Sequence, residues 1–273
     1  MSARPGCTYL AGAPLLVAHR GGSRLAPENT MAAFRAAVDT WGADMIETDV
    51  RLSADGHVMV IHDATVDRTT DRVGAVAGYT AGELGRMDAG AAFVDLDGAA
   101  SFAGTGEGVP RLDHVLEAFP FMRFNVEAKE ARVAGPLVEV VRRAGARERV
   151  LVAAEFEANR RDARGYGGPW GASRHQVFWF WLGHRLPGGG PYVPPVDILQ
   201  VPETFRGLRI VSPDFVAAAH RRNLPVQVWT VDDPADMRRL LDWGVDGIQT
   251  DRPDLLARVL HDAVGRALPP GCS

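Results

Sequence analysis

Short apolar runs alternate with amphipathic stretches along most of this chain, and turn-forming residues separate them. Short apolar runs bounded by turns are typical of buried strands, whereas apolar positions that recur with a helical period are typical of helices. The runs predict eight main strands, over residues 15–19, 45–51, 123–128, 150–154, 176–182, 196–201, 225–230 and 247–250. Helices are predicted over residues 30–41, 80–87, 112–119, 136–144, 158–163, 215–222, 233–243 and 253–260.

The alternation of strands with helices favours a (β/α)₈ barrel (TIM barrel). An open doubly wound sheet is the alternative, but it would usually carry a G-x-G-x-x-G turn after its first strand, and Gly21-Gly22 lacks that spacing. We expect one domain over residues 1–273, with an additional short strand at 58–62. The loosely patterned stretch of about residues 64–109 is predicted to be a small insertion after the second barrel strand.

Polar residues follow or end several of the predicted strands. An unpaired charge at the end of a buried strand is costly, so its presence calls for an explanation. In a barrel of this type, catalytic residues lie at the carboxyl ends of the strands. The residues that fall there are His19, Glu47, Asp49, Glu127, Lys129 and Trp229. The pattern therefore predicts an active site built from these strand ends.

Glu47 and Asp49 are two residues apart on a predicted strand, so their side chains share one face. Two carboxylates this close repel each other unless a positive charge lies between them. With Glu127 as a third acid, the set suits a divalent cation that prefers oxygen ligands, Mg²⁺ or Ca²⁺, better than zinc. The alternative is that Glu47 or Asp49 simply pairs with an arginine such as Arg51.

His19 and His62 each end an apolar run and are each followed by a charged residue. Two histidines that titrate near neutral pH can serve as base and acid in one displacement. Arg20 and Lys129 would supply positive charge for a phosphate group. This combination favours phosphoryl chemistry.

Composition limits the other possibilities. The chain has 46% hydrophobic and 23% charged residues and a formal net charge of −4, which is typical of a soluble globular protein and offers no basic footprint for nucleic acid. No stretch approaches the roughly 20 apolar residues that span a bilayer. Residues 1–13 lack the apolar core of a secretory signal, so we expect a cytoplasmic protein without stable membrane insertion. The oligomeric state stays open.

Several motifs occur in an order that resembles the glycerophosphodiester phosphodiesterase family over nearly the whole chain. They are His19-Arg20-Gly21, Pro27-Glu28-Asn29-Thr30, residues 42–50, Asp55-Gly56, His62-Asp63, Arg68-Thr69-Thr70, residues 109–112, Asn125-Val126-Glu127-Ala128-Lys129, Trp229-Thr230-Val231, residues 244–248 and Thr250-Asp251-Arg252-Pro253. Any one tripeptide would be weak evidence, but the set as a whole is specific.

The resemblance implies a (β/α)₈ barrel that hydrolyses glycerophosphodiesters to glycerol 3-phosphate and an alcohol with a divalent cation. It implies attack by the glycerol 2-hydroxyl on phosphorus, followed by opening of a cyclic phosphate by water. It gives roles to eight residues: the acid-base pair His19 and His62, the metal ligands Glu47, Asp49 and Glu127, the phosphate contacts Arg20 and Lys129, and Trp229 beside the glycerol.

Two features depart from the family pattern. Glu155-Phe156 stands where the family often has Ser-Phe, so Glu155 is either a further metal or water ligand or a solvent-facing acid. The segment 165–195 matches no family motif. Alternative functions are therefore a phosphodiesterase of phospholipase D type that acts on lysophospholipids, or a non-catalytic barrel that binds a phosphate ligand. A long apolar groove, in residues 64–109 or around Trp179 and Trp181, would favour the lipid substrate.

Overall fold

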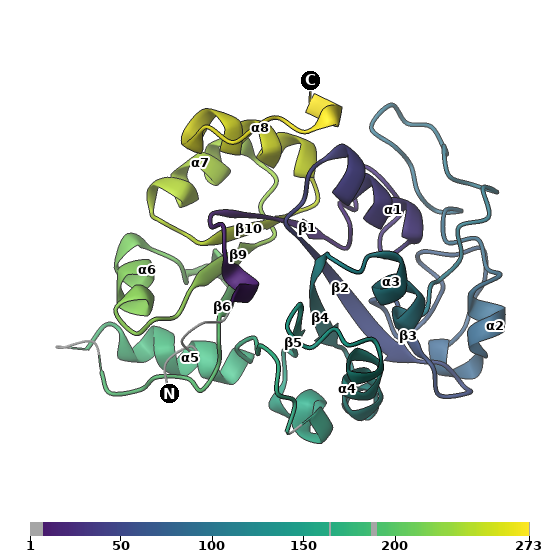
Figure 1. Ribbon diagram of the computed structural model, residues 1–273, viewed down its shortest axis with the longest axis horizontal. Coiled ribbons are helices and arrows are strands. Elements are labelled where there is room, and N and C mark those ends of the chain that lie inside the picture. Colours follow the sequence, from purple (N-terminus) through teal and green to yellow (C-terminus); the bar gives the residue numbers. More distant parts are fainter. Residues whose placement is uncertain (1–7, 164, 187–189, 273) are drawn as a thin grey trace.

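A curled parallel sheet forms the centre of the molecule (Figure 1). The computed structural model describes residues 8–163, 165–186 and 190–272. The strands of the sheet follow one another in the order β5-β4-β2-β1-β10-β9-β6, and each adjacent pair is parallel. Their bounds are β1 Leu15–His19, β2 Met45–Leu52, β4 Arg123–Ala128, β5 Val150–Ala153, β6 Leu199–Pro202, β9 Val226–Trp229 and β10 Gly247–Thr250.

Two residues close the ring between β5 and β6. Trp170 forms a parallel bridge with Val152 of β5, and Gly171 forms one with Ile198, which immediately precedes β6. Trp170-Gly171 therefore occupies the position of the fifth barrel strand. With this segment, the order around the ring matches the order along the chain, so the predicted (β/α)₈ barrel is confirmed.

The predicted strand over residues 176–182 is wrong, because these residues belong to helix α5 (Arg174–Gly183). The apolar run 177–182 is continuous, and such a run does not distinguish a strand from a buried helix. The deciding signal is Ser173, whose hydroxyl accepts a hydrogen bond from the Gln176 amide while the Gln176 side chain accepts one from the Ser173 amide. This capping box starts a helix.

The helices lie around the outside of the sheet (Figure 1). Thr30 caps the first of them, as its position in the sequence predicts, and its side chain accepts a hydrogen bond from the Ala33 amide. The helical elements are η1 Thr8–Leu10, α1 Met31–Arg35, the π-helix η2 Ala36–Thr40, α3 Leu112–Ala118, η4 Ala131–Val133, α4 Ala134–Arg143, the 3₁₀ helix η5 Glu157–Ala163, α6 Pro213–His220, α7 Pro234–Asp242, α8 Pro253–Val264 and η7 Pro270–Cys272.

An insertion separates β2 from its helix α3. It begins with β3 (Val58–Val60), which pairs antiparallel with β2, and contains η3 (Val76–Gly78) and the single helical turn α2 (Ala81–Leu84). Its buried side chains form a hydrophobic cluster that is distinct from the main core. This cluster includes Met59, Ile61, Val66, Val76, Leu84 and Met87. The insertion thus carries its own small core beside the barrel.

Alternation along the strands positions the site. Leu15 and Val17 belong to the cluster inside the barrel, whereas Leu16 and Ala18 belong to the cluster under the helices. Since successive side chains of a strand point to opposite faces, His19 continues the inward row of β1. Glu47 and Asp49 likewise continue the inward row that Met45 begins on β2. The barrel interior is thus apolar at one end and charged at the other.

Within the described ranges, every helix is too short or too polar to cross a lipid bilayer.

Candidate active site

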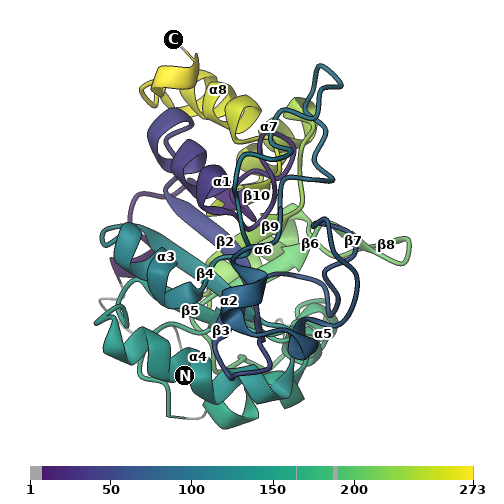
Figure 2. The same cartoon turned by 90° about the vertical axis from the view of Figure 1, so that its right-hand side faces the viewer.

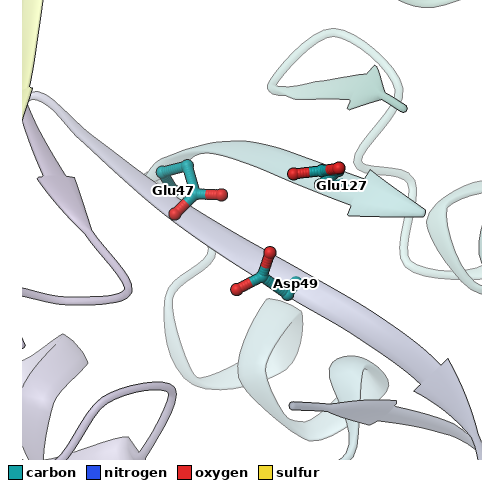
Figure 3. Close-up of side chains that lie close together, drawn as sticks. All are labelled: Glu47, Asp49 and Glu127. Carbon is teal, nitrogen blue, oxygen red and sulfur yellow. The ribbon is translucent and has the colours of Figure 1, made fainter. Parts of the chain in front are cut away.

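Three carboxylates gather where β2 and β4 lie side by side, two from β2 and one from near the carboxyl end of β4 (Figure 3). The parallel register sets Asp49 opposite Glu127 and Glu47 opposite Asn125, so all four side chains lie on the inward face of the two strands. One oxygen atom from each of Glu47, Asp49 and Glu127 lies within 4.8 Å of the other two. The three predicted acids are therefore brought together.

Burial and mutual repulsion govern the ionisation of these acids. Burial, followed by the neighbouring charge of Asp49, raises the pKa of Glu47 to about 8. Burial also raises the pKa of Glu127. Burial favours the neutral form of Asp49 too, but the positive charges of Arg20 and Lys129 outweigh it and lower the pKa of that acid. Simultaneous ionisation of all three acids is therefore disfavoured unless further positive charge is present.

Arg20 and Lys129 bring positive charge into contact with the cluster. The Arg20 Nε atom lies 3.2 Å from Asp49 Oδ2. The Lys129 Nζ atom lies 3.5 Å from Asp49 Oδ1 and 3.2 Å from Glu127 Oε2. Arg51, the arginine considered as a partner from the sequence, instead donates to the backbone carbonyl of His62 at 2.8 Å. Arg51 is therefore not the partner of Glu47 or Asp49, and the arginine that pairs with Asp49 is Arg20.

Each of the two candidate histidines has a carboxylate at its Nδ1 atom. His19 Nδ1 lies 2.7 Å from Asp251 Oδ1, and His62 Nδ1 lies 2.6 Å from Asp63 Oδ1. A carboxylate on Nδ1 favours the tautomer that leaves Nε2 available to a ligand. His19 Nε2 lies 3.8 Å from Glu47 Oε2, so its ring points toward the acid cluster.

The environment of His19 also changes its basicity. Burial alone would lower its pKa, but the hydrogen bond to Asp251 and the nearby charges of Glu47 and Asp251 outweigh burial and raise the pKa to about 9. Asp251 belongs to the motif Thr250-Asp251-Arg252-Pro253, and the sequence alone predicts no role for it. It directly follows the last barrel strand, and in a closed barrel that strand is the neighbour of β1, which is the signal that could have identified it.

A chain of ion pairs connects the two sides of the site. Arg20 Nη1 donates to Glu28 at 3.0 Å, and Glu28 accepts two further bonds from Arg68, at 2.7 and 2.8 Å. Arg68 Nε in turn donates to Asp63 at 2.6 Å. Asp63, which holds His62, is thereby linked to Arg20, which contacts Asp49. The link runs through Arg68 and Glu28.

The turn after β1 requires glycine. Arg20 has φ 52° and Gly21 has φ 86°, a left-handed conformation that glycine adopts without strain. A Cβ atom at Gly21 would lie 2.8 Å from the Cβ of Ala33 at the start of α1. The sequence His-Arg-Gly-Gly thus lets the chain turn tightly while helix α1 packs against the turn.

A pocket of about 480 Å³ opens over the strand ends. All eight residues singled out from the sequence line it: His19, Arg20, Glu47, Asp49, His62, Glu127, Lys129 and Trp229. Glu155 also lines it, but its carboxylate pairs with Arg174 at 3.2 Å and is not part of the three-carboxylate group. The opposite wall is largely apolar and comes from α5 and from the hairpin of β7 (Thr204–Phe205) and β8 (Leu208–Arg209).

Comparison with known proteins gives a consistent result. The profile of the Glycerophosphoryl diester phosphodiesterase family matches residues 19–164 and 188–255. The chain is 35% identical over 256 residues to "Probable glycerophosphodiester phosphodiesterase 2" of Mycobacterium tuberculosis, which covers 91% of each protein.

Solved structures agree with this match. A glycerophosphodiester phosphodiesterase from Agrobacterium tumefaciens superimposes with a TM-score of 0.73 at 32% identity, over 89% of this chain and 99% of the other. A phosphodiesterase from Oleispira antarctica, solved in complex with the product sn-glycerol-3-phosphate, has the same fold, with a TM-score of 0.74 at 22% identity over 92% of this chain and 98% of the other.

Proposed function

This chain belongs to the glycerophosphoryl diester phosphodiesterase family and is a phosphodiesterase; we propose that it hydrolyses glycerophosphodiesters to glycerol 3-phosphate and an alcohol by paired-histidine catalysis with a divalent cation. The observation that carries the proposal is the presence, in one pocket, of two carboxylate-anchored histidines and a cluster of three carboxylates. The product bound to the Oleispira antarctica enzyme supports glycerol 3-phosphate as the product.

The donor set fits a hard cation. Glu47 and Asp49 are only 4% and 1% exposed, and buried carboxylates in mutual contact are stabilised by a shared positive ion. The Oδ1 atom of Asn125, which also lines the pocket, is buried without a hydrogen-bond partner in the part of the chain that the structure describes. Oxygen donors alone are typical of Mg²⁺ and Ca²⁺ sites. We therefore propose that Glu47, Asp49 and Glu127 hold one of these ions.

The bound cation would add positive charge at the phosphoryl oxygens and polarise them. Arg20 and Lys129 act at the same group in this proposal. Their side chains are 17% and 15% exposed, so each is mostly buried, and both line the pocket. A substrate phosphate would replace part of their contact with Asp49 and gain charge-assisted hydrogen bonds.

His19 and His62 move the protons in the proposed reaction. One removes the proton from the attacking hydroxyl, and the other gives a proton to the oxygen of the departing alcohol. Asp251 and Asp63 hold the two rings in position through Nδ1. The attacking group is the glycerol 2-hydroxyl, which is already part of the substrate, and its attack releases the alcohol and leaves a cyclic glycerol phosphate. Water then opens the cyclic phosphate to give glycerol 3-phosphate. Trp229 would lie against the glycerol.

The test is a product assay on purified protein. Glycerophosphodiesters with several different alcohols are incubated with strong chelator, and then with Mg²⁺ or Ca²⁺ in excess. We expect glycerol 3-phosphate to form only after the cation is restored. Full activity in chelator would exclude the metal role, and no activity on any diester would exclude the reaction.

A further inference from the structure

One face of α5 lines the pocket opposite the acid cluster. Arg174, Val177, Phe178 and Trp181 contribute to it. These positions follow the spacing i, i+3, i+4, i+7, which is one stripe of a helix. Phe180 points to the opposite side and is buried in the core. The helix is thus apolar toward the pocket as well as toward the core.

The hairpin β7–β8 continues this wall, and Figure 2 shows it projecting beyond the end of β6. Phe205, Leu208 and Ile210 line the same pocket. Together the helix stripe and the hairpin form what we call the apolar wall: Val177, Phe178, Trp181, Phe205, Leu208 and Ile210. Phe178 and Leu208 are 50% and 55% exposed. Apolar surface left open in a pocket, next to a charged site, marks a place where an apolar group binds.

The charges on this wall exclude one obvious occupant. An aromatic wall can hold a quaternary ammonium group through cation–π contacts. Here, however, the guanidinium of Arg174 lies 4.4 Å from the ring centre of Phe205, and that of Arg185 lies 3.7 Å from the ring centre of Trp181. Arg206 lies 5.6 Å from Phe205. Guanidinium groups already lie over the rings of Phe205 and Trp181, so a quaternary ammonium group would have to displace them to reach these rings.

We propose that the apolar wall binds an aliphatic chain carried by the phosphodiester, so that single-chain phosphodiesters are preferred to short, polar ones. The proposal rests on the proposed function, because the acid cluster and the histidines at the other end of the pocket would hold the phosphodiester itself. The chain extends from there toward α5 and the hairpin. Two kinds of substrate carry such a chain: those with an alkyl alcohol as the leaving group, and lysophospholipids with an acyl chain on the glycerol.

Two substrate series distinguish these sources. In one, glycerol 3-phosphate is esterified with ethanol, butanol or octanol. In the other, glycerophosphocholine carries no acyl chain, a butanoyl chain or an octanoyl chain on the glycerol. All are assayed as monomers with saturating cation. We expect kcat/KM to rise with chain length in one series, by up to about fourfold for each methylene that is buried. The series that responds identifies which side of the phosphate faces the wall.

A terminal charge tests the role of the arginines. Within the responding series, a trimethylammonium group at the end of the longest chain should cancel most of the gain. A higher kcat/KM for the charged chain would mean that the aromatic rings act as an ammonium site, and the aliphatic assignment would be overturned.

Variants of the wall provide the third arm. Phe178→Ser and Leu208→Ser, singly and together, should reduce the ratio of kcat/KM between the longest and shortest substrates, by at least tenfold in the double variant. Phe121→Ser is the matched control, since Phe121 is 96% exposed and does not line the pocket; its ratio should equal that of the parent. If the ratio is unchanged in the double variant, the apolar wall does not bind the aliphatic chain and the proposal is wrong.

The outcomes separate the two proposals. If the short diesters are hydrolysed but neither series responds to chain length in the parent protein, the aliphatic site is wrong and the phosphodiesterase assignment stands. If no diester of any length is hydrolysed, the proposed function itself fails. The parent protein gives this answer even if a wall variant does not fold.

Discussion

The Nδ1 atom of His19 lies 2.7 Å from Oδ1 of Asp251, and this contact joins the end of the first barrel strand to the residue after the last one. The two residues are 232 positions apart in the chain. They meet because β10 pairs with β1 in parallel and closes the ring. Barrel closure therefore sets the orientation of one of the two candidate catalytic histidines.

Replacing Asp251 with asparagine should lower kcat by about 10- to 100-fold, the range typical of a partner that orients a functional histidine. It should also lower the pKa of His19 below about 9, because Asp251 raises it. Ring signals of His19, followed by NMR in the cation-free protein, measure this shift independently of activity. Asp246→Asn is the control, since Asp246 pairs with the solvent-exposed His220 at 2.7 Å, outside the pocket.

The two histidines should depend on each other. His19→Ala and His62→Ala should each lower kcat by about 10²–10⁴-fold, the usual contribution of positioned acid-base catalysis. Since both act in one displacement, the loss of kcat in the double variant should be far smaller than the product of the losses in the two single variants. Steady-state kinetics on a slow substrate measure this, with the exposed His114→Ala as control. A single variant with near-parental kcat would remove that histidine from the mechanism.

Glu127→Gln should weaken cation binding and activity together. The substitution keeps the size of the side chain but removes one of the three negative charges in the cluster. Calorimetric titration with Mg²⁺ or Ca²⁺ should show a loss of affinity of at least tenfold. Glu139→Gln is the matched control, because Glu139 pairs with Arg142 and Arg143 on α4 and does not line the pocket. Equal affinity in both variants would exclude Glu127 as a ligand.

Cation affinity should increase with pH. Below about 8, the pKa of Glu47 in the cation-free protein, this carboxyl binds a proton that the cation must displace. Affinity should therefore fall as the pH is lowered from 8 to 6, by up to about tenfold per unit for one displaced proton. Titrations in two buffers of different ionisation enthalpy report the released proton. Constant affinity over this range would show that Glu47 gives up no proton on binding.

Removal of the glycerol 2-hydroxyl from the substrate should reduce kcat much more than it raises KM. The hydroxyl acts in the transition state, and a nucleophile held within the substrate gains greatly from proximity. The phosphate contacts of Arg20, Lys129 and the cation would be unchanged. Parallel kinetics of the hydroxy and deoxy diesters make the comparison. Equal kcat values would point to direct attack by water and rule out a cyclic intermediate.

The sequence predicts the barrel and the strand-end chemistry because both depend on local pattern. Inward rows such as Met45, Glu47 and Asp49 are visible as alternation along a single strand. The fifth strand could not be found in this way, since Trp170-Gly171 is too short to carry a period and its bridges depend on β5 and β6. The continuous apolar run in α5 is therefore assigned from the sequence as the fifth strand, in place of Trp170-Gly171.

Ion-pair partners that are distant in the chain could not be predicted from the sequence either. Arg51 is close to Glu47 and Asp49 in the chain and is the arginine that the sequence offers as an alternative to a metal ion, but its side chain donates to the backbone carbonyl of His62. The left-handed conformation of Arg20 brings that residue to Asp49 instead. Such choices are settled by turn geometry and strand register, which composition and spacing do not encode.

The length of the pairing between neighbouring strands varies around the barrel. β2 and β4 are paired over six residues and carry the acids. The segment Trp170-Gly171, the seam of the barrel, is joined to its neighbours by one β-bridge on each side. The apolar wall begins just beyond that seam, in α5. Mutations that reshape the wall therefore fall in α5 and in the hairpin after β6, whereas the acid cluster lies on the strand pair with the longest register. A lineage with this architecture can change which diesters it accepts while the machinery that cleaves them stays intact.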